Sequence, residues 1–229
     1  MIKKRSKTIV VLGMHKSGTS MVAGVLYKLG ISIGKELIKK HWSNPLGHFE
    51  DKDFFNLNRE ILKAAGGRWD LPPDQKAILK QGDIFKEKII NLVSNKSELW
   101  GWKDPRTNLT IELYLPYLKN PYFLVCYRDS EAVAKSLFKR NKIENARAKI
   151  LKGEYDSRIK EFFEKYPYLP RLDLQYEKVI SQPVKWVNEI INFLDIQVED
   201  EKKNQAIRFI LPNKNMHELS KKLLNKDHS

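Results

Sequence analysis

The chain of 229 residues has a single cysteine, Cys126, and no apolar run that approaches the length of a membrane-spanning helix. One cysteine excludes an internal disulfide framework and fits a reducing compartment. A spanning helix needs about 20 apolar residues and a signal peptide needs a 7–15-residue apolar core. The basic N-terminus is followed only by TIVVL at 8–12, which is too short for either. We therefore expect a soluble, cytoplasmic protein without an integral membrane span.

Acidic residues are scarce relative to basic ones. The chain has 28 Asp and Glu residues against 42 Lys and Arg residues, which gives a formal net charge of +14. Such an excess favours an anionic partner, which could be nucleic acid, a membrane surface, or a phosphorylated or sulfated small molecule. Internal repeats and low-complexity linkers are also lacking, so residues 1–229 are expected to form a single domain.

Strand and helix patterns alternate along the chain. The short β-branched run at 8–13 and the run YFLVCY at 122–127 are typical of strands buried on both faces. Shorter strands are expected at 98–104 and 171–176, and Asp51, Asp129 and Pro183 are placed to start helices. Residues 31–50 are expected to be mostly loop, and the tail from about 200 is polar and weakly patterned. This alternation predicts an α/β fold with a central parallel sheet flanked by helices.

The loop GMHKSGTS at 13–20 lies between a predicted strand and a predicted helix. Its glycine spacing is close to the P-loop pattern G-x-x-x-x-G-K-[ST], but Thr19 follows the second glycine and Lys16 precedes it by two residues. Backbone N–H groups of a glycine-rich turn at a helix N-terminus form an anion site. The candidate ligand residues are Lys16, Ser17, Gly18, Thr19 and Ser20. The alternative is a simple strand–turn–helix corner in which glycine only supplies unusual backbone angles.

A second phosphate site is predicted at the end of the 122–127 strand. Arg128 follows the strand, where parallel α/β sheets bind ligands. Ser136 and Arg140 are four residues apart and share one helix face. Guanidinium groups with a nearby hydroxyl suit a terminal phosphate dianion. For Arg140 alone, a solvated basic helix end explains the residue equally well.

These motifs resemble those of sulfotransferases. HKSGTS at 15–20 is similar to their 5′-phosphosulfate loop, K-[ST]-G-[ST]-[ST], and Arg128 with Ser136 resembles their 3′-phosphate motif. The resemblance implies a modified, P-loop-like three-layer fold, the co-substrate 3′-phosphoadenosine 5′-phosphosulfate (PAPS), its product 3′,5′-adenosine bisphosphate (PAP), and no metal. The segment at 173–196 is also similar and implies that Tyr176 lies near the adenine. A partly buried structural tyrosine is an equal alternative.

The resemblance extends to the chemistry. HWSNPLGHFED at 41–51 resembles the region of protein-tyrosine and bacterial sulfotransferases that carries a catalytic glutamate, which implies Glu50 as the base. His48 is the rival base, whereas His41 is more typical of a loop surface. WKDPR at 102–106 resembles the KDP segment, so Lys103 is expected to stabilise the transferring sulfuryl group.

Three further roles remain to be assigned. Lys16 is the candidate for stabilising the bridging and leaving oxygens, and Asp104 with Arg106 is expected to form an orienting ion pair. In the tail, Lys214 or Arg208 is the candidate for touching the nucleotide.

The sequence therefore predicts a PAPS-dependent sulfotransferase whose acceptor is a carbohydrate or another hydroxylated metabolite. An ATP-dependent P-loop kinase is the first alternative, and Thr19 in the place of the P-loop lysine argues against it. A basic nucleic-acid-binding module is the second. No helix-turn-helix, zinc or RNA-binding signature supports it, so no nucleic-acid partner is expected.

Overall fold

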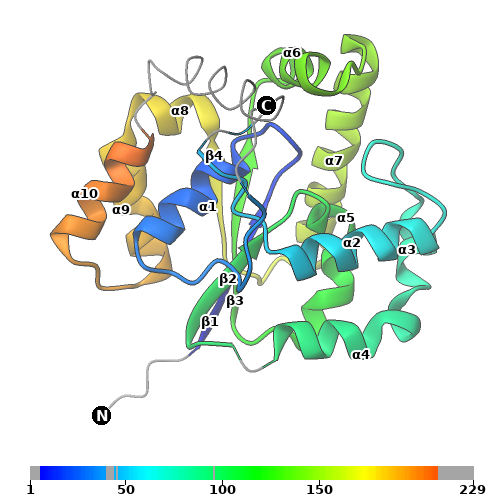
Figure 1. Ribbon diagram of the computed structural model, residues 1–229, viewed down its shortest axis with the longest axis horizontal. Coiled ribbons are helices and arrows are strands. Elements are labelled where there is room, and N and C mark those ends of the chain that lie inside the picture. The colour runs from blue at the N-terminus through cyan, green and yellow to red at the C-terminus, as the bar shows by residue number, and fades with distance from the viewer. Residues whose placement is uncertain (1–5, 40–43, 45, 95, 211–229) are drawn as a thin grey trace, which may run out of the picture.

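The computed structural model describes residues 6–39, 44, 46–94 and 96–210 (Figure 1). Its centre is a four-stranded parallel sheet in the order β2-β1-β3-β4. The strands are β1 (Lys7–Leu12), β2 (Leu99–Lys103), β3 (Pro121–Tyr127) and β4 (Arg171–Gln175). The predicted α/β class and all four predicted strands are confirmed.

Successive residues of the inner strands enter two separate cores, because side chains alternate between the faces of a strand. In β1, Val10 and Leu12 belong to one core, whereas Ile9 and Val11 belong to the other. β3 divides in the same way, and its Cys126 is buried as predicted, with burial raising the pKa of the thiol. Both faces of the sheet are thus covered, which explains why these runs are continuously apolar.

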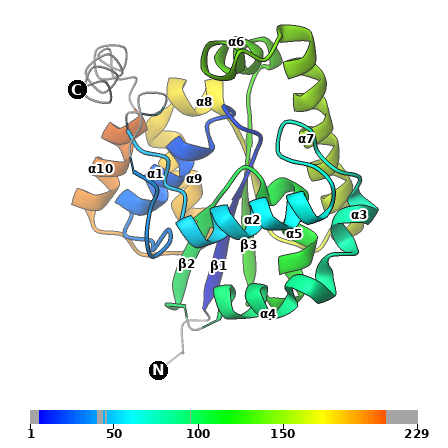
Figure 2. The same cartoon turned by 45° about the vertical axis from the view of Figure 1, so that its right-hand side comes forward.

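Helices on the first face contribute to the core that holds Val10. Figure 2 brings this side of the molecule toward the viewer. They are α2 (Lys52–Ala64), α3 (Gln75–Leu79), α4 (Gly82–Val93), α5 (Thr107–Tyr114), α6 (Ser130–Asn141) and α7 (Asn145–Lys165), with the short 3₁₀ turn η1 (Leu115–Tyr117) packed at the edge. The second face is covered by α1 (Thr19–Lys28), α8 (Tyr176–Ser181), α9 (Pro183–Leu194) and α10 (Asp200–Ile210). Figure 1 shows the two groups on opposite sides of the strands.

The chain leaves β1 and β3, which are neighbours, toward opposite faces of the sheet. β1 leads into α1 on the second face, and β3 leads into α6 and α7 on the first. Such a divergence leaves a crevice at the carboxyl edge of the strands, where open α/β sheets bind their ligands. The fold therefore brings the loop after Leu12 and the residue after Tyr127 to the same place.

The predicted helix starts are confirmed. Asp51 caps α2 by accepting from Asp53 N and Phe54 N, Asp129 caps α6 by accepting from Ala132 N, and Pro183 opens α9. The tail departs from expectation, because α10 extends the regular structure to Ile210 and buries Ala206 with it. Lys214 lies outside the described residues. Among the described residues, no helix combines the length and apolar character that crossing a lipid bilayer requires.

Candidate active site

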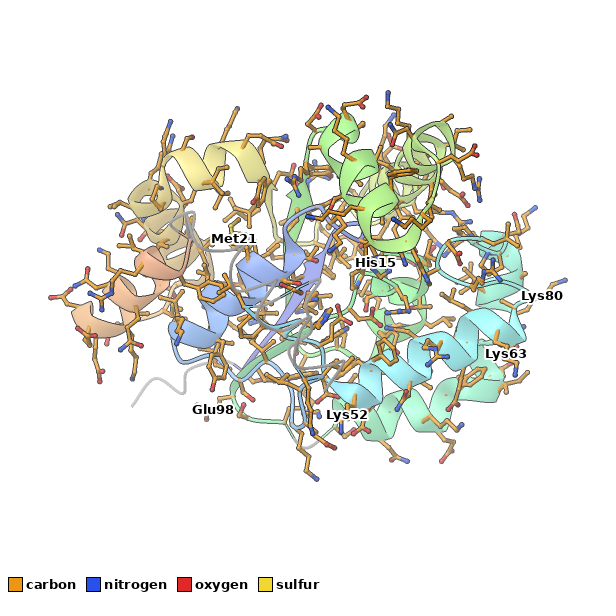
Figure 3. The ribbon with its side chains drawn as sticks, turned by 45° about the horizontal axis from the view of Figure 1, so that its top comes forward. His15, Met21, Lys52, Lys63, Lys80 and Glu98 are labelled. Carbon is orange, nitrogen blue, oxygen red and sulfur yellow. The ribbon has the colours of Figure 1, made fainter. Side chains whose placement is uncertain are left out.

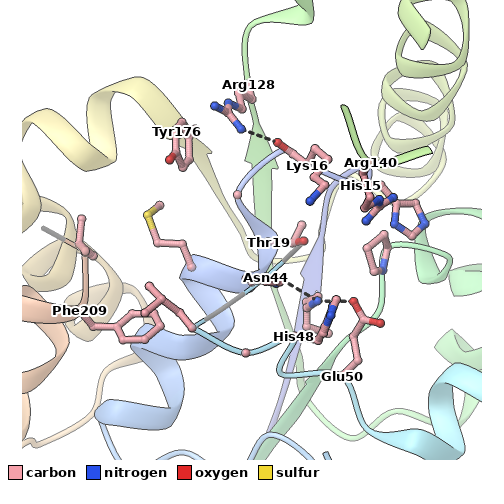
Figure 4. A pocket seen from close by; sticks show the side chains of 18 residues that line it. His15, Lys16, Thr19, Asn44, His48, Glu50, Arg128, Arg140, Tyr176 and Phe209 are labelled. Atoms are coloured by element: carbon pink, nitrogen blue, oxygen red, sulfur yellow. Dashed lines mark hydrogen bonds and ion pairs between the residues drawn. The ribbon is translucent and has the colours of Figure 1, made fainter. Parts of the chain in front are cut away.

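A pocket lies at the carboxyl edge of β1, β2 and β3 (Figure 4). Its walls come from the loop after β1, the start of α1, the segment before α2, the loop after β2, and residues of α6, α8 and α10. Ten residues predicted as site residues line it: Lys16, Gly18, Thr19, Ser20, His48, Glu50, Lys103, Arg128, Arg140 and Tyr176. The fold thus brings segments from His15 to Ile210 together to line one pocket.

The loop between β1 and α1 adopts the left-handed backbone that an anion cradle requires. Gly13, Lys16 and Gly18 have φ values of 141°, 71° and 94°. A Cβ on Gly18 would lie 2.6 Å from Cδ2 of Tyr176, so this position needs glycine for both its conformation and its neighbour. Gly18 is also the N-cap of α1, which leaves the first N–H groups of that helix at the pocket.

Arg128 joins the loop to the start of α8. Its Nη1 donates to the carbonyl of Lys16 at 3.0 Å, and its guanidinium carbon lies 4.2 Å from the centre of the Tyr176 ring. Its Nε is 4.0 Å from Oε1 of Glu177. Arg128 and Tyr176, which the sequence separates by 48 positions, therefore form one wall of the pocket. Their roles toward a nucleotide stay predictions.

Glu50 and Lys103 form a buried ion pair opposite that wall. Lys103 Nζ is 2.5 Å from Oε1 of Glu50, and it also donates to Ser20 Oγ at 3.1 Å. Asn44 Nδ2 donates to the same hydroxyl at 2.9 Å. Lys103 is 1% exposed and Glu50 is 7% exposed. Burying two charges has a free-energy cost that their attraction often only offsets, so this pair is weak evidence for stability and instead suggests a functional role.

Burial and the positive charge of the pocket lower the pKa values of the basic side chains Lys16 and Arg140. Burial, followed by the charges of Arg140, Arg128 and Lys103, lowers the pKa of Lys16 to about 7, against the opposing effect of Glu50. Burial also lowers the pKa of Arg140. A basic group whose charged form is disfavoured in this way is strongly stabilised when an anion binds beside it.

His15 is a pocket residue that the sequence analysis did not identify. Burial, followed by the charges of Arg106 and Arg140, lowers its pKa well below the ordinary value, so the ring is neutral. Its ring centre is 4.3 Å from that of Trp69, and its Nε2 has no hydrogen-bond partner among the described residues. The contact joins two segments 54 positions apart, and nothing in either segment predicts it.

The ion pair expected after β2 is present. Asp104 is fully buried, and its Oδ1 accepts from Arg106 Nη1 at 2.8 Å. Asn58 Nδ2 donates to its other oxygen at 2.9 Å. Burial raises the pKa of Asp104, which Arg106 opposes. The pair fixes the turn that follows Lys103 and so orients that lysine.

Other predicted residues stand apart from the pocket. Ser136 of α6 and the buried Ser17 do not line it, so their roles stay predictions. Arg208 of α10 donates instead to Glu201 at 3.2 Å. His41 lies outside the described residues. Besides His15, the sequence analysis missed Asn44 and Phe209, which line the pocket from the loop before α2 and from α10.

Solved structures with a similar fold are sulfotransferases. Sulfotransferase STF1 from Mycobacterium tuberculosis is 13% identical with a TM-score of 0.52, over 96% of this chain and 77% of that one. The sulfotransferase domain of the Synechococcus PCC 7002 olefin synthase is 15% identical with a TM-score of 0.54, over 97% and 88%. That of the curacin biosynthetic pathway is 15% identical with a TM-score of 0.52, over 87% and 77%. No protein-family model and no curated protein matches the chain. The chain has the sulfotransferase fold, as its loop motifs predict.

Proposed function

We propose that the protein is a sulfotransferase that moves a sulfuryl group from PAPS to the hydroxyl of a carbohydrate or another hydroxylated metabolite. The observation that carries the proposal is the pairing of Lys16 with Arg128. Lys16 precedes Gly18 in an anion-binding loop, and Arg128 holds the carbonyl of that lysine from the end of β3. A phosphosulfate at the loop and a phosphate at Arg128 match the two ends of this co-substrate.

The residues present fit a nucleotide with two separate anionic groups, a 5′-phosphosulfate and a 3′-phosphate. The lack of a Cβ at Gly18 lets the Tyr176 ring pack directly against the cradle, where an aromatic surface is available to a nucleotide base. The cations Lys16, Arg128 and Arg140 face the same pocket. When bound, PAPS supplies the activated sulfuryl group and a phosphate leaving group.

Each charged side chain then has a distinct task. Lys16, with its lowered pKa, is placed to stabilise charge on the leaving oxygens, which is the dominant requirement in such transfers. Glu50 takes the proton of the acceptor hydroxyl. Lys103 holds that carboxylate in position at 2.5 Å and adds positive charge where the sulfuryl group passes. His48, which also lines the pocket, is the alternative base.

A thermal-shift comparison of nucleotides tests the proposal. PAP without Mg²⁺ should raise the melting temperature strongly, because a ligand at a hundred times its Kd adds about 2.7 kcal/mol of stability. For 229 residues this corresponds to roughly 5–10 °C. ATP with Mg²⁺ should give a much smaller rise. Stabilisation by ATP and Mg²⁺ with none by PAP would favour the kinase alternative and reject the sulfotransferase.

The same assay tests the predicted 3′-phosphate site at Arg128. In Arg128→Ala, the shift with PAP should fall to that with 5′-AMP, which lacks the 3′-phosphate. Arg171→Ala removes a half-exposed arginine of β4 and should leave the difference between the two nucleotides intact. Each variant is compared with its own ligand-free melting temperature, which separates nucleotide binding from any loss of stability.

A further inference from the structure

A second, basic groove lies next to the pocket, on the outer side of α2. Its volume is about 760 Å³, and its charged and aromatic lining residues include Phe55, Arg59, Lys63, Arg68, Trp69 and Arg106. Figure 3 shows Lys63 on α2, at a distance from His15 in the centre of the molecule. The groove is separate from the nucleotide pocket and is large enough for a sugar of a few rings.

Two of the cations in the groove lack a carboxylate partner within the described part of the chain. Arg68 and Arg106 pair with Asp70 and Asp104, and the groove residue Glu60 pairs with Lys88. Arg59 and Lys63, in contrast, form no ion pair with any carboxylate that the structure describes. Arg59 and Lys63 lie four residues apart on α2, and like charges at this spacing repel each other. An anion in the groove would relieve that repulsion.

The wall of the groove that carries Trp69 is held from behind by α7. Tyr155 Oη donates to the carbonyl of Trp69 at 2.8 Å, and Arg147 Nη2 donates to that of Asp70 at 3.1 Å. Arg158 Nη2 donates to the carbonyl of Pro73 at 2.8 Å. On the α2 side, the Phe55 ring lies 5.4 Å from the guanidinium of Arg59 and 4.4 Å from that of Arg106. Both walls are therefore fixed before any ligand arrives, which lowers the entropic cost of binding.

The groove adjoins the nucleotide pocket through two shared boundaries. Trp69 of the groove packs on His15 of the pocket with ring centres 4.3 Å apart. Pro105 lines the pocket, and the next residue, Arg106, lines the groove. A molecule in the groove would thus lie beside the side of the pocket to which Lys103 and its loop belong.

We propose that this basic groove binds the acceptor and selects one that carries an anionic group, a carboxylate, sulfate or phosphate, recognised by Arg59 and Lys63. The inference rests on the proposed sulfotransferase function and narrows its acceptor to a charged hydroxylated compound. The anionic group sits on α2 while a hydroxyl of the same molecule reaches Glu50. The net charge of +14 agrees with an anionic acceptor. The proposal itself depends on the side chains of Arg59 and Lys63.

Calorimetric titration of the PAP-saturated protein with matched sugar pairs tests the inference. The pairs are a galacturonate trimer and its methyl ester, and sulfated and phosphorylated disaccharides with their unmodified forms. At least one anionic member should bind about tenfold more tightly than its neutral partner, which corresponds to about 1.4 kcal/mol. Arg59→Ala/Lys63→Ala should abolish that preference. Neutral sugars should bind the variant and the wild type equally.

A charge-matched variant separates a built site from general attraction. Lys178→Ala/Lys185→Ala removes two exposed lysines from α8 and α9, on the other face of the sheet. It should keep the preference for the anionic sugar. Equal weakening by both double variants, or no anionic sugar bound better than its partner, overturns the inference. Absence of PAP binding in a separate titration would instead reject the proposed function and leave the preference of the groove measurable on the free protein.

Discussion

At the scale of single residues, the pair Glu50–Lys103 has the clearest consequence. The carboxylate is buried, touches an ammonium group at 2.5 Å, and stands in the pocket beside Ser20 and His48. A glutamate in this position can accept a proton from a hydroxyl that enters the pocket, and the lysine fixes the direction from which it does so. The sequence resemblance assigns a role in the transfer to both residues, and the structure brings them together in the pocket, where these roles stay predictions.

Glu50→Gln keeps the shape of the side chain but removes the base. We expect kcat for sulfuryl transfer from PAPS to fall by about 10²–10⁴, the usual contribution of a positioned base. The Kd for PAP should stay within about twofold, since Glu50 is not assigned to the nucleotide. Steady-state kinetics and calorimetry measure the two quantities. A variant that keeps more than about a tenth of the wild-type kcat would contradict the assignment and make His48 the next residue to replace.

The stability of that variant needs its own control, because Lys103 loses its carboxylate partner inside the protein. Glu50→Gln/Lys103→Met removes both charges from the buried site and should recover the melting temperature lost in the single variant. It should not recover activity. Loss of kcat in a stable double variant separates the chemistry from folding.

At the scale of elements, α10 packs unusually close to α1. A Cβ on Gly24 of α1 would lie 2.2 Å from Cε1 of Phe209, and Phe209 lines the pocket of the candidate active site. The absence of a side chain at Gly24 therefore sets how near α10 comes to the site. An aromatic contact between Phe209 and Phe49, with ring centres 5.7 Å apart, links the same helix to the segment before Glu50.

Gly24→Ala should destabilise the protein although alanine is the better helix former. We expect a loss of about 1–3 kcal/mol in the free energy of unfolding, the usual cost of overpacking. Gly153→Ala in α7 is the matched control, because its Cβ would meet nothing within 4 Å. That change should stabilise the protein by about 0.5–1 kcal/mol. Urea unfolding measures both, and a stabilising Gly24→Ala would contradict the close packing.

The elements also show which parts of the fold could be predicted from the sequence. β1 and β3 were predictable because strands buried on both faces must be continuously apolar, and the loop at 13–18 because it joins such a strand to a helix. α10 was not, because DEKKNQAIRFI is mostly polar and its burial rests on a few residues near one end. His15 was also beyond reach, since its significance comes from Trp69 and from arginines that only the tertiary fold brings near it.

At the scale of the whole molecule, the fold concentrates positive charge at one edge of the sheet. Lys16 follows β1, Lys103 ends β2, Arg128 follows β3, and Arg140 arrives from α6. The pKa of Lys16 is lowered to about 7, first by burial and then by Arg140 and Arg128. The free protein therefore carries a cluster of like charges, and an anionic ligand relieves their repulsion.

The burial of Lys16, together with that repulsion, should make stability depend on pH in a definite direction. Between the folded pKa of Lys16, about 7, and its ordinary value of 10.5, the unfolded chain binds more protons than the folded one, so the free energy of unfolding rises with pH. We expect a rise of about 1 kcal/mol from pH 7 to 9 in urea unfolding, after allowance for partial exposure of the side chain. Lys16→Met should flatten this dependence, whereas Lys185→Met, on the exposed surface of α9, should not. Saturating PAP should flatten it too, because the bound anion favours the charged lysine. A wild-type curve with no rise over this range, or one that Lys16→Met leaves unchanged, would show that folding does not disfavour the charged form of Lys16.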